Sequence, residues 1–283
     1  MTRMRAFVAA ILLLSQLGVG LTRAVPAKAS FPQGSGIAQN QGFDTCTDPT
    51  QSQMGTWWTY SPYYWVGAYI GGLEMLCTQP NLSASWLTNV YNQGWKFQFF
   101  WVGLQAPCTT YKYTFSSNTT TAFNQGKSEA INAVNKLFSL GVVNPAQGTA
   151  VTFDLDEAPS QCQSATSSFI SGFDYQLSLS PAQKSGVYGS VCASNLQALA
   201  SIRYVPGYIF GGDPDGNMTT KDLWFDPGHC GVTSGVWINS QRIKQWLIDN
   251  PDSYGGVPLT VDRDCANTWV NPSGSGTDQN CIA

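Results

Sequence analysis

Residues 151–159 read Val-Thr-Phe-Asp-Leu-Asp-Glu-Ala-Pro, an apolar run that ends in Asp154, Asp156 and Glu157. A short apolar run bounded by proline predicts a buried strand. Alternation along a strand sends Asp154 and Asp156 to the same face, and Glu157 then falls on the following loop. Active sites of (β/α)8 barrels form at the carboxyl ends of the strands, so this stretch predicts a barrel strand and candidate catalytic acids together.

Seven further short runs of apolar or aromatic residues are bounded by glycine or proline, and each predicts a strand. With the run at 150–156, the expected strands are 42–46, 65–71, 96–104, 186–191, 207–211, 242–248 and 258–262. Apolar residues at three- and four-residue steps predict helices over 80–93, 121–140 and 193–202. Helices after the sixth and seventh strands are poorly marked. The pattern predicts an α/β fold, a single (β/α)8 TIM barrel over residues 42–268.

The first 29 residues have the features of a secretory signal peptide: two arginines, a largely apolar run over 6–21, and Ala27-Lys28-Ala29 as a cleavage site. Residues 30–41 are small and polar, and we expect a flexible lead-in there. Cleavage removes four basic residues and leaves 10 Lys and Arg against 17 Asp and Glu. We therefore expect a secreted protein, extracellular or associated with the cell wall.

All eight cysteines lie after this leader, and an even number in an oxidising compartment favours up to four disulfides. A zinc site is the weaker alternative, because the chain has no Cys-x-x-Cys spacing and His229 is its single histidine. Proximity in sequence favours Cys77 with Cys108 and Cys265 with Cys281. The second pair would pin the tail at 269–283.

The composition argues against several classes of partner. The chain is 43% hydrophobic and only 11% charged, and its mature part is acidic, so we expect no nucleic acid as partner. No apolar stretch after the leader reaches about 18 residues, so we expect no membrane span after cleavage. No glycine-rich phosphate loop occurs, and we expect no cofactor, no metal and a monomer. Residues 213–217, Asp-Pro-Asp-Gly-Asn, resemble the start of a calcium loop but lack its closing glutamate; a solvated turn is the alternative.

Two other expected strands carry an acid near their end, Asp44 and Asp262. The first and eighth strands of a closed barrel are neighbours, so these two should lie close together and across from Asp156. Neighbouring carboxyl groups raise one another's pKa, which keeps one protonated as an acid while another is ionised. Cleavage of a glycosidic bond requires such a combination. The alternative is that these aspartates cap helices or pair with Arg263 and Lys244, an alternative strongest for Asp264.

Five short motifs, taken in order, are similar to the strand motifs of a known family. They are Gly-Phe-Asp at 42–44, Asp-Leu-Asp at 154–156, Val-Tyr-Gly-Ser at 187–190, Gln-Trp at 245–246 and Val-Asp at 261–262. Together they resemble a glycoside-hydrolase-like TIM-barrel family of secreted bacterial proteins, long described as a domain of unknown function and related to the family-25 lysozymes. The resemblance spans residues 42–265.

The resemblance implies roles for four aspartates. Asp44 and Asp262 correspond to the first- and eighth-strand aspartates of the lysozymes. The fourth strand of those enzymes ends Asp-x-Glu, with the glutamate as the acid, and the matching positions are Asp154 and Asp156. The side chain at the acid position, Asp156, is thus one methylene shorter than the glutamate of the lysozymes. Glu157 could replace it only if the loop turned inward.

These observations favour a glycoside hydrolase, or a hydrolase-like protein, that acts on a cell-wall polysaccharide such as peptidoglycan or on another polysaccharide. Asp156 would be the general acid, with Asp44, Asp154 and Asp262 positioning water or stabilising positive charge. The expected substrate contacts are Glu157, Tyr188, Gln105, Trp101, Gln245 and Trp246, because flat rings stack on sugars and polar groups fix their hydroxyls. The alternatives are a noncatalytic carbohydrate-binding barrel and an extracellular structural protein.

Overall fold

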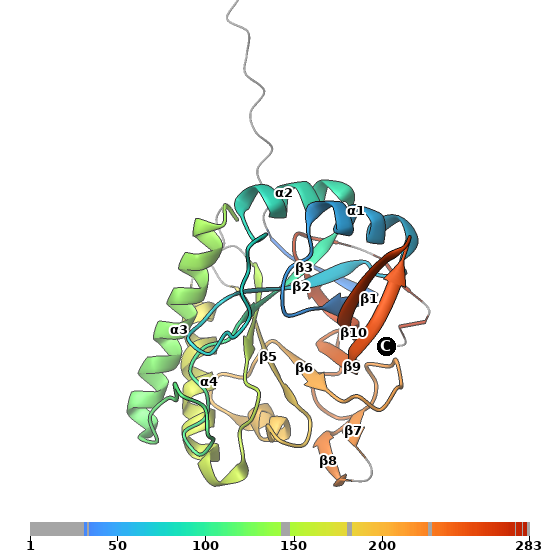
Figure 1. Ribbon diagram of the computed structural model, residues 1–283. Helices are drawn as coiled ribbons and strands as arrows, with labels where there is room; N and C mark the ends of the chain where they lie inside the picture. Colours follow the sequence, from blue (N-terminus) through green and yellow to red (C-terminus); the bar gives the residue numbers. More distant parts are fainter. Residues whose placement is uncertain are drawn as a thin grey trace, which may run out of the picture.

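A computed structural model of the protein describes residues 31–32, 34–142, 148–179, 183–225, 228–274, 276–278 and 280–281. The expected signal peptide over residues 1–29 lies outside them. Within the described part, eight strands close into a barrel in the order β1-β10-β9-β6-β5-β4-β3-β2 (Figure 1). The barrel strands are β1 (Gly36–Asp44), β2 (Trp65–Gly71), β3 (Lys96–Trp101), β4 (Ala150–Asp154), β5 (Lys184–Ser190), β6 (Tyr208–Gly212), β9 (Arg242–Tyr254) and β10 (Val257–Val270). Each corresponds to a strand expected from the sequence.

The barrel departs from the expected (β/α)8 topology at its last strand. Seven strands run parallel, but β10 runs antiparallel to both of its neighbours, β9 and β1. β9 turns directly into β10 at Gly255 and Gly256, whose φ angles are +57° and +78°. Two consecutive glycines at positive φ form a tight hairpin turn, which leaves no room for a helix between these strands. The closed α/β barrel is confirmed, whereas the all-parallel TIM barrel is not.

Four α-helices cover the outside of the barrel: α1 (Gln51–Tyr60), α2 (Ala84–Gln93), α3 (Thr119–Ser139) and α4 (Gln163–Ser178). α2 and α3 were expected. α1 and α4 were not, because small polar residues dilute their apolar pattern. α4 lies alongside α3 at close range (Figure 1). A Cβ atom on Gly126 of α3 would lie 2.0 Å from the Phe169 carbonyl oxygen of α4, so glycine permits this approach.

The connection after β4 holds a short 3-10 turn and then α4, whereas those after β5 and β6 hold only short elements. η1 (Ser160–Cys162) is a 3-10 turn that leads into α4. The helix expected over 193–202 is a short 3-10 helix, η2 (Leu196–Ser201). After β6 the chain forms a two-stranded sheet of β7 (Leu223–Phe225) and β8 (Cys230–Val232) in place of a helix. The expected lead-in is also partly structured, since β1 already begins at Gly36.

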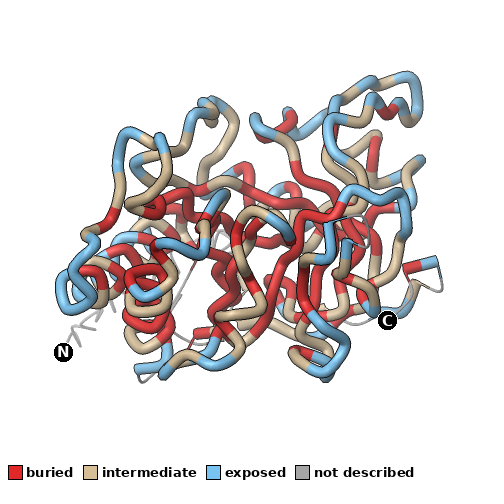
Figure 2. The backbone as a smooth tube through the Cα atoms, turned by 90° about the horizontal axis from the view of Figure 1, so that it is seen from below, coloured by how far each residue is buried: buried red, intermediate tan, exposed pale blue. Residues whose placement is uncertain are grey.

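The barrel interior is filled by side chains rather than hollow. Trp65, Phe100, Tyr208 and Phe210 are almost fully buried there and pack with small residues of the other strands. Figure 2 shows the buried backbone in the middle of the molecule, with exposed segments around it. A Cβ atom on Gly42 would lie 2.0 Å from the Trp65 ring, so glycine makes space for this indole. The filled interior leaves room for a site only at an end of the barrel.

All eight cysteines are paired, as Cys46–Cys77, Cys108–Cys162, Cys192–Cys230 and Cys265–Cys281. The expected number of disulfides and the Cys265–Cys281 pair are confirmed. The expected Cys77–Cys108 pair is wrong, because Cys46 and Cys77 follow two strands, β1 and β2, that lie side by side in the barrel. Within the described ranges, no helix is long and apolar enough to span a membrane.

Candidate active site

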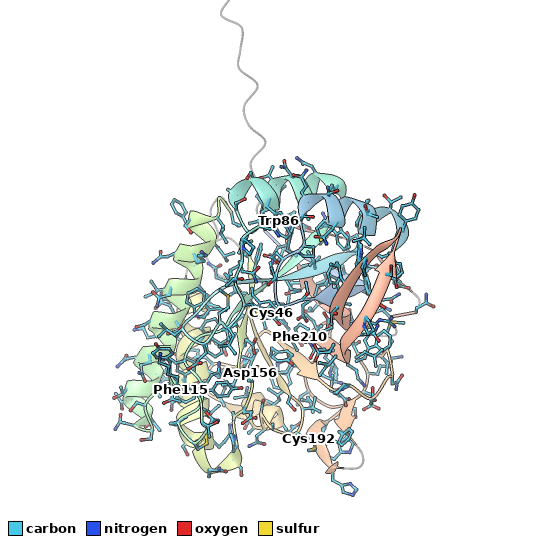
Figure 3. All side chains as sticks on the ribbon, in the orientation of Figure 1. Cys46, Trp86, Phe115, Asp156, Cys192 and Phe210 are labelled. Carbon is cyan, nitrogen blue, oxygen red and sulfur yellow. A yellow bond between two sulfur atoms is a disulfide. The ribbon has the colours of Figure 1, made fainter. Side chains whose placement is uncertain are left out.

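The carboxyl ends of the parallel strands surround a pocket of about 500 Å³, which we call the acidic pocket. It lies above the packed barrel interior, where β1 ends at Asp44 and β4 ends at Asp154. Figure 3 shows Cys46 and Asp156, on the loops after these two strands, near the centre of the view. The lining residues are Asp44, Thr45, Cys46, Thr47, Tyr69, Glu74, Met75, Leu76, Cys77, Val102, Asp154, Asp156, Asp249, Thr260 and Asp262.

Asp44 and Asp262 form the first acidic pair. They face each other in the β1–β10 register. The Gln245 side-chain amide donates to Oδ2 of both, at 3.2 Å each, so the two oxygens are at most 6.4 Å apart (3.2 + 3.2). The Tyr69 hydroxyl donates to Asp44 Oδ1 at 2.8 Å, and the Asp249 backbone N–H donates to Asp262 Oδ1 at 2.7 Å.

Burial makes the charged form of this pair unfavourable. Desolvation raises the pKa of Asp44 to about 7, and repulsion by Asp262 adds to the rise, while the donors Tyr69 and Gln245 oppose it. The pKa of Asp262 is raised as well, chiefly by desolvation. Near neutral pH the pair therefore exchanges a proton readily, as acid–base catalysis requires.

Asp154 and Asp156 form the second acidic pair. Asp154 is buried, and desolvation followed by repulsion from Asp156 holds its pKa well above the usual range. Asp156 is half-buried, and its Oδ2 accepts from the Tyr111 hydroxyl at 3.0 Å. The raised pKa favours the protonated form of Asp154. Both residues line the pocket, and Asp156 is the more accessible of the two.

Gln105 supports this second pair from behind. Its side-chain amide donates to the Asp154 carbonyl oxygen at 2.8 Å, and its Oε1 accepts the Asp156 backbone N–H at 3.1 Å. The Ser194 hydroxyl contacts the Asp156 carbonyl oxygen at 2.7 Å from the other side. Gln105 is therefore a positioning residue that fixes the loop after β4.

The structure brings the four candidate catalytic residues, Asp44, Asp154, Asp156 and Asp262, into one pocket. Of the expected substrate contacts, Gln245 bridges the first acidic pair. The Tyr188 hydroxyl donates to Gln245 Oε1 at 2.8 Å.

Three expected substrate contacts lie elsewhere. Trp101 is buried on the helix side of β3, where its indole donates to Glu129 of α3. Trp246 faces away from the pocket, with the Arg263 guanidinium 5.5 Å from its ring centre. Glu157 is exposed on the loop and does not turn inward. The direction of the Trp246 side chain follows from alternation along β9, because neighbouring residues such as Gln245 and Trp246 point to opposite faces of the strand.

The alternative that basic side chains neutralise the site does not hold for these four aspartates. Arg263 pairs with Asp252 instead. Lys244 is buried against the 213–217 loop, with Nζ 3.0 Å from Asp213 and 2.9 Å from Asp215. The lysine thus neutralises the carboxylates that a calcium ion would need. No three Asp, Glu, His or Cys side chains in the described part of the chain are grouped to hold a metal ion.

The sequence analysis missed several residues of this region, above all Asp264. Asp264 is fully buried next to the pocket, and its pKa is held well above the usual range by desolvation and then by repulsion from Asp44 and Asp262. Its position two residues after Asp262 on one strand was the available signal, since alternation gives both the same face. Glu74, Asp249 and Tyr69 also line the pocket and were not selected.

The family described as Rv2525c-like, glycoside hydrolase-like domain matches residues 56–266, well over half of the chain. The chain belongs to this family. The resemblance drawn from the strand motifs is thereby confirmed. No curated protein matches the chain.

Two solved structures are similar in fold. An uncharacterized protein of B. stearothermophilus has a TM-score of 0.51 and 14% identity, with 80% of this chain and 95% of that chain covered. The Mycobacterium tuberculosis Tat-secreted protein Rv2525c, in complex with HEPES, has a TM-score of 0.48 and 14% identity, with coverages of 81% and 96%.

Proposed function

We propose that the protein is a secreted glycoside hydrolase that cleaves a cell-wall or other polysaccharide in the acidic pocket. The observation that carries this proposal is the convergence of two neighbouring carboxyl pairs, Asp44 with Asp262 and Asp154 with Asp156, in one pocket at the end of the barrel where the parallel strands finish. Hydrolysis of a glycosidic bond requires one protonated and one ionised carboxyl group at the same bond. Family membership points to the same chemistry.

In this scheme the Asp154–Asp156 pair supplies the acid. Asp156, the more accessible member, donates a proton to the glycosidic oxygen, and the bond from that oxygen to the anomeric carbon breaks. The positive charge that develops at the anomeric carbon is stabilised by the Asp44–Asp262 pair, which also orients a water molecule. The water adds its hydroxyl to the anomeric carbon, and its proton restores the acid.

Secretion is part of the proposal. Four disulfides require an oxidising compartment to form and persist. The similarly folded Rv2525c is a Tat-secreted protein. A secreted hydrolase would meet peptidoglycan or another extracellular polysaccharide as its substrate and would act as a monomer.

The test is release of reducing ends from a panel of purified polysaccharides that includes peptidoglycan. Wild type is compared with Asp156→Asn and with Glu157→Gln, a matched control because Glu157 is the exposed neighbour. Loss of a general acid lowers the rate by about 10²- to 10⁴-fold, so Asp156→Asn should be nearly inactive and Glu157→Gln active. Equal activity of all three would contradict the assignment of the acid.

A noncatalytic carbohydrate-binding protein is the second candidate. Two observations favour it: the acid position holds the shorter aspartate, and Asp156 Oδ2 is already engaged by Tyr111. The same panel separates the two candidates. Retention of a polysaccharide by wild type without release of any reducing ends would support binding alone.

A further inference from the structure

The acidic pocket has a strongly one-sided charge. Six of its lining residues are acids: Asp44, Glu74, Asp154, Asp156, Asp249 and Asp262. No lysine, arginine or histidine is among the described residues that line it. Lys112, which interacts with Glu74, is fully exposed and lies outside the lining. No basic side chain of the described lining therefore balances the acids of the pocket that are ionised, and a cationic ligand would do so.

Buried acceptor atoms also lack donors. Asp154 is only 4% exposed and lines the pocket, yet its Oδ1 has no hydrogen-bond partner in the described structure. A buried carboxylate oxygen without a donor is costly. A ligand that brings N–H or O–H groups to this oxygen would remove the cost.

The chemistry of these acceptors discriminates among sugar substituents. An ammonium group offers three donors, no acceptor and a positive charge. An acetamide offers one N–H, and its carbonyl oxygen would face the carboxylates that already repel one another. A cation in the pocket would offset the repulsion from Asp262 that contributes to the raised pKa of Asp44.

We propose that the acidic pocket selects a cationic amino sugar, a hexosamine unit that carries a free protonated amine in place of an acetamide. This inference rests on the proposed function and names its substrate class, a polysaccharide with de-N-acetylated residues. The amine lies among Asp154 and the neighbouring acids, while Glu74 and Asp249 at the rim attract further amines along the polymer.

The experiment compares two probes that differ only in this substituent, the tetramers of glucosamine and of N-acetylglucosamine. Binding to the disulfide-bonded wild type is measured by titration calorimetry at about pH 6, where amines are protonated. Two additional charge interactions of ordinary strength correspond to about tenfold tighter binding of the glucosamine tetramer, and added salt should reduce this preference. Equal binding of the two tetramers, or tighter binding of the acetylated one, overturns the inference.

Variants of acidic residues at the rim of the acidic pocket test whether the preference for the glucosamine tetramer arises there. Glu74→Gln and Asp249→Asn should each lower the preference for the glucosamine tetramer by about two- to fivefold. Asp222→Asn is the matched control, because it removes the same charge from outside the pocket and should leave the preference unchanged. An equal loss in all three variants would mean that only the net charge of the protein matters, and would overturn the inference.

Failure of this inference is distinguishable from failure of the proposed function. Preferential binding of the glucosamine tetramer without release of reducing ends refutes hydrolysis and supports the amine site. Hydrolysis of acetylated polymers with no preference for the amine supports hydrolysis and refutes the amine site. Titration with calcium and magnesium chloride completes the test, since binding of a divalent ion that excludes the glucosamine tetramer would overturn the inference.

Discussion

Replacing Asp44 with asparagine should make the folded protein less sensitive to rising pH. The pKa of Asp44 is raised from 3.8 to about 7 in the folded protein, because the carboxyl group is buried and faces Asp262. The folded state therefore keeps a proton that the unfolded chain releases. Its contribution to stability is fully present below pH 3.8 and is lost as the pH rises through about 7.

The size of the effect follows from this rise in pKa. At about 1.4 kcal/mol per pKa unit, a rise from 3.8 to about 7 corresponds to about 4 kcal/mol of stability lost between acid and mildly alkaline pH. Asparagine is uncharged and cannot incur this loss. It also relieves Asp264, whose pKa is raised partly by repulsion from Asp44. The substitution also changes the hydrogen bonds to Tyr69 and Gln245. That cost in stability is independent of pH, so it does not affect how the unfolding free energy changes with pH.

The assay is chemical denaturation of wild type and Asp44→Asn at a series of pH values from about 4 to about 9. The difference in unfolding free energy should shift by about 4 kcal/mol in favour of the variant across this range. Asp249→Asn serves as the control, because Asp249 is exposed at the rim of the same pocket. Parallel curves for wild type and Asp44→Asn would refute the desolvation argument.

Three further predictions concern the support of the site. Gln105→Ala should lower kcat by about 10- to 100-fold with little change in KM, because it frees the loop after β4 without touching the substrate; a change in KM alone would contradict this. Replacing Cys46 and Cys77 with serine opens a loop closed over 31 residues and should cost about 3–4 kcal/mol, measured by thermal unfolding against wild type. Gly126→Ala should lower the free energy of unfolding by about 1–3 kcal/mol. Gly235→Ala should leave it nearly unchanged, because nothing lies within 4 Å of the added Cβ. Equal effects of the two substitutions would argue against close packing of α3 on α4.

The strands were predictable because their signals are local. β2 was predicted at its observed bounds, Trp65 to Gly71, from a continuous apolar run ended by glycine. The direction of β10 was not predicted, because its second half carries Asp264 and other polar residues that face the barrel interior rather than water. The paired glycines at Gly255 and Gly256 were the missed signal, since they mark a hairpin between two strands.

The candidate site was predicted in part for the same reason. Asp44 and Asp262 were expected together because barrel closure makes the first and last strands neighbours. They do meet, although β10 runs antiparallel, because β10 continues past Asp262 to Val270 and its register pairs Asp262 with Asp44. The position of Trp101 was not readable, because β3 is buried on both faces and its pattern does not show which face meets the helices and which the barrel interior. Glu74 lies on a turn after β2, where no periodicity exists to predict which way a side chain points. Asp249 lies within β9 at a φ of +50°, a local departure from extended backbone that alternation along the strand does not predict.

Three of the disulfides join the loops that follow neighbouring strands, in the pairs β1 with β2, β3 with β4, and β5 with β6. Cys46–Cys77 lines the acidic pocket and so fixes its mouth, while the other two disulfides cross-link loops outside the lining, and each pair is covalently independent of the other two. Such a mouth acquires its shape when the cysteines are oxidised, before any sugar arrives, and binding then orders little of the protein. In the proposed hydrolase, a polysaccharide would enter an opening that is already formed, and turnover would not require a lid to close.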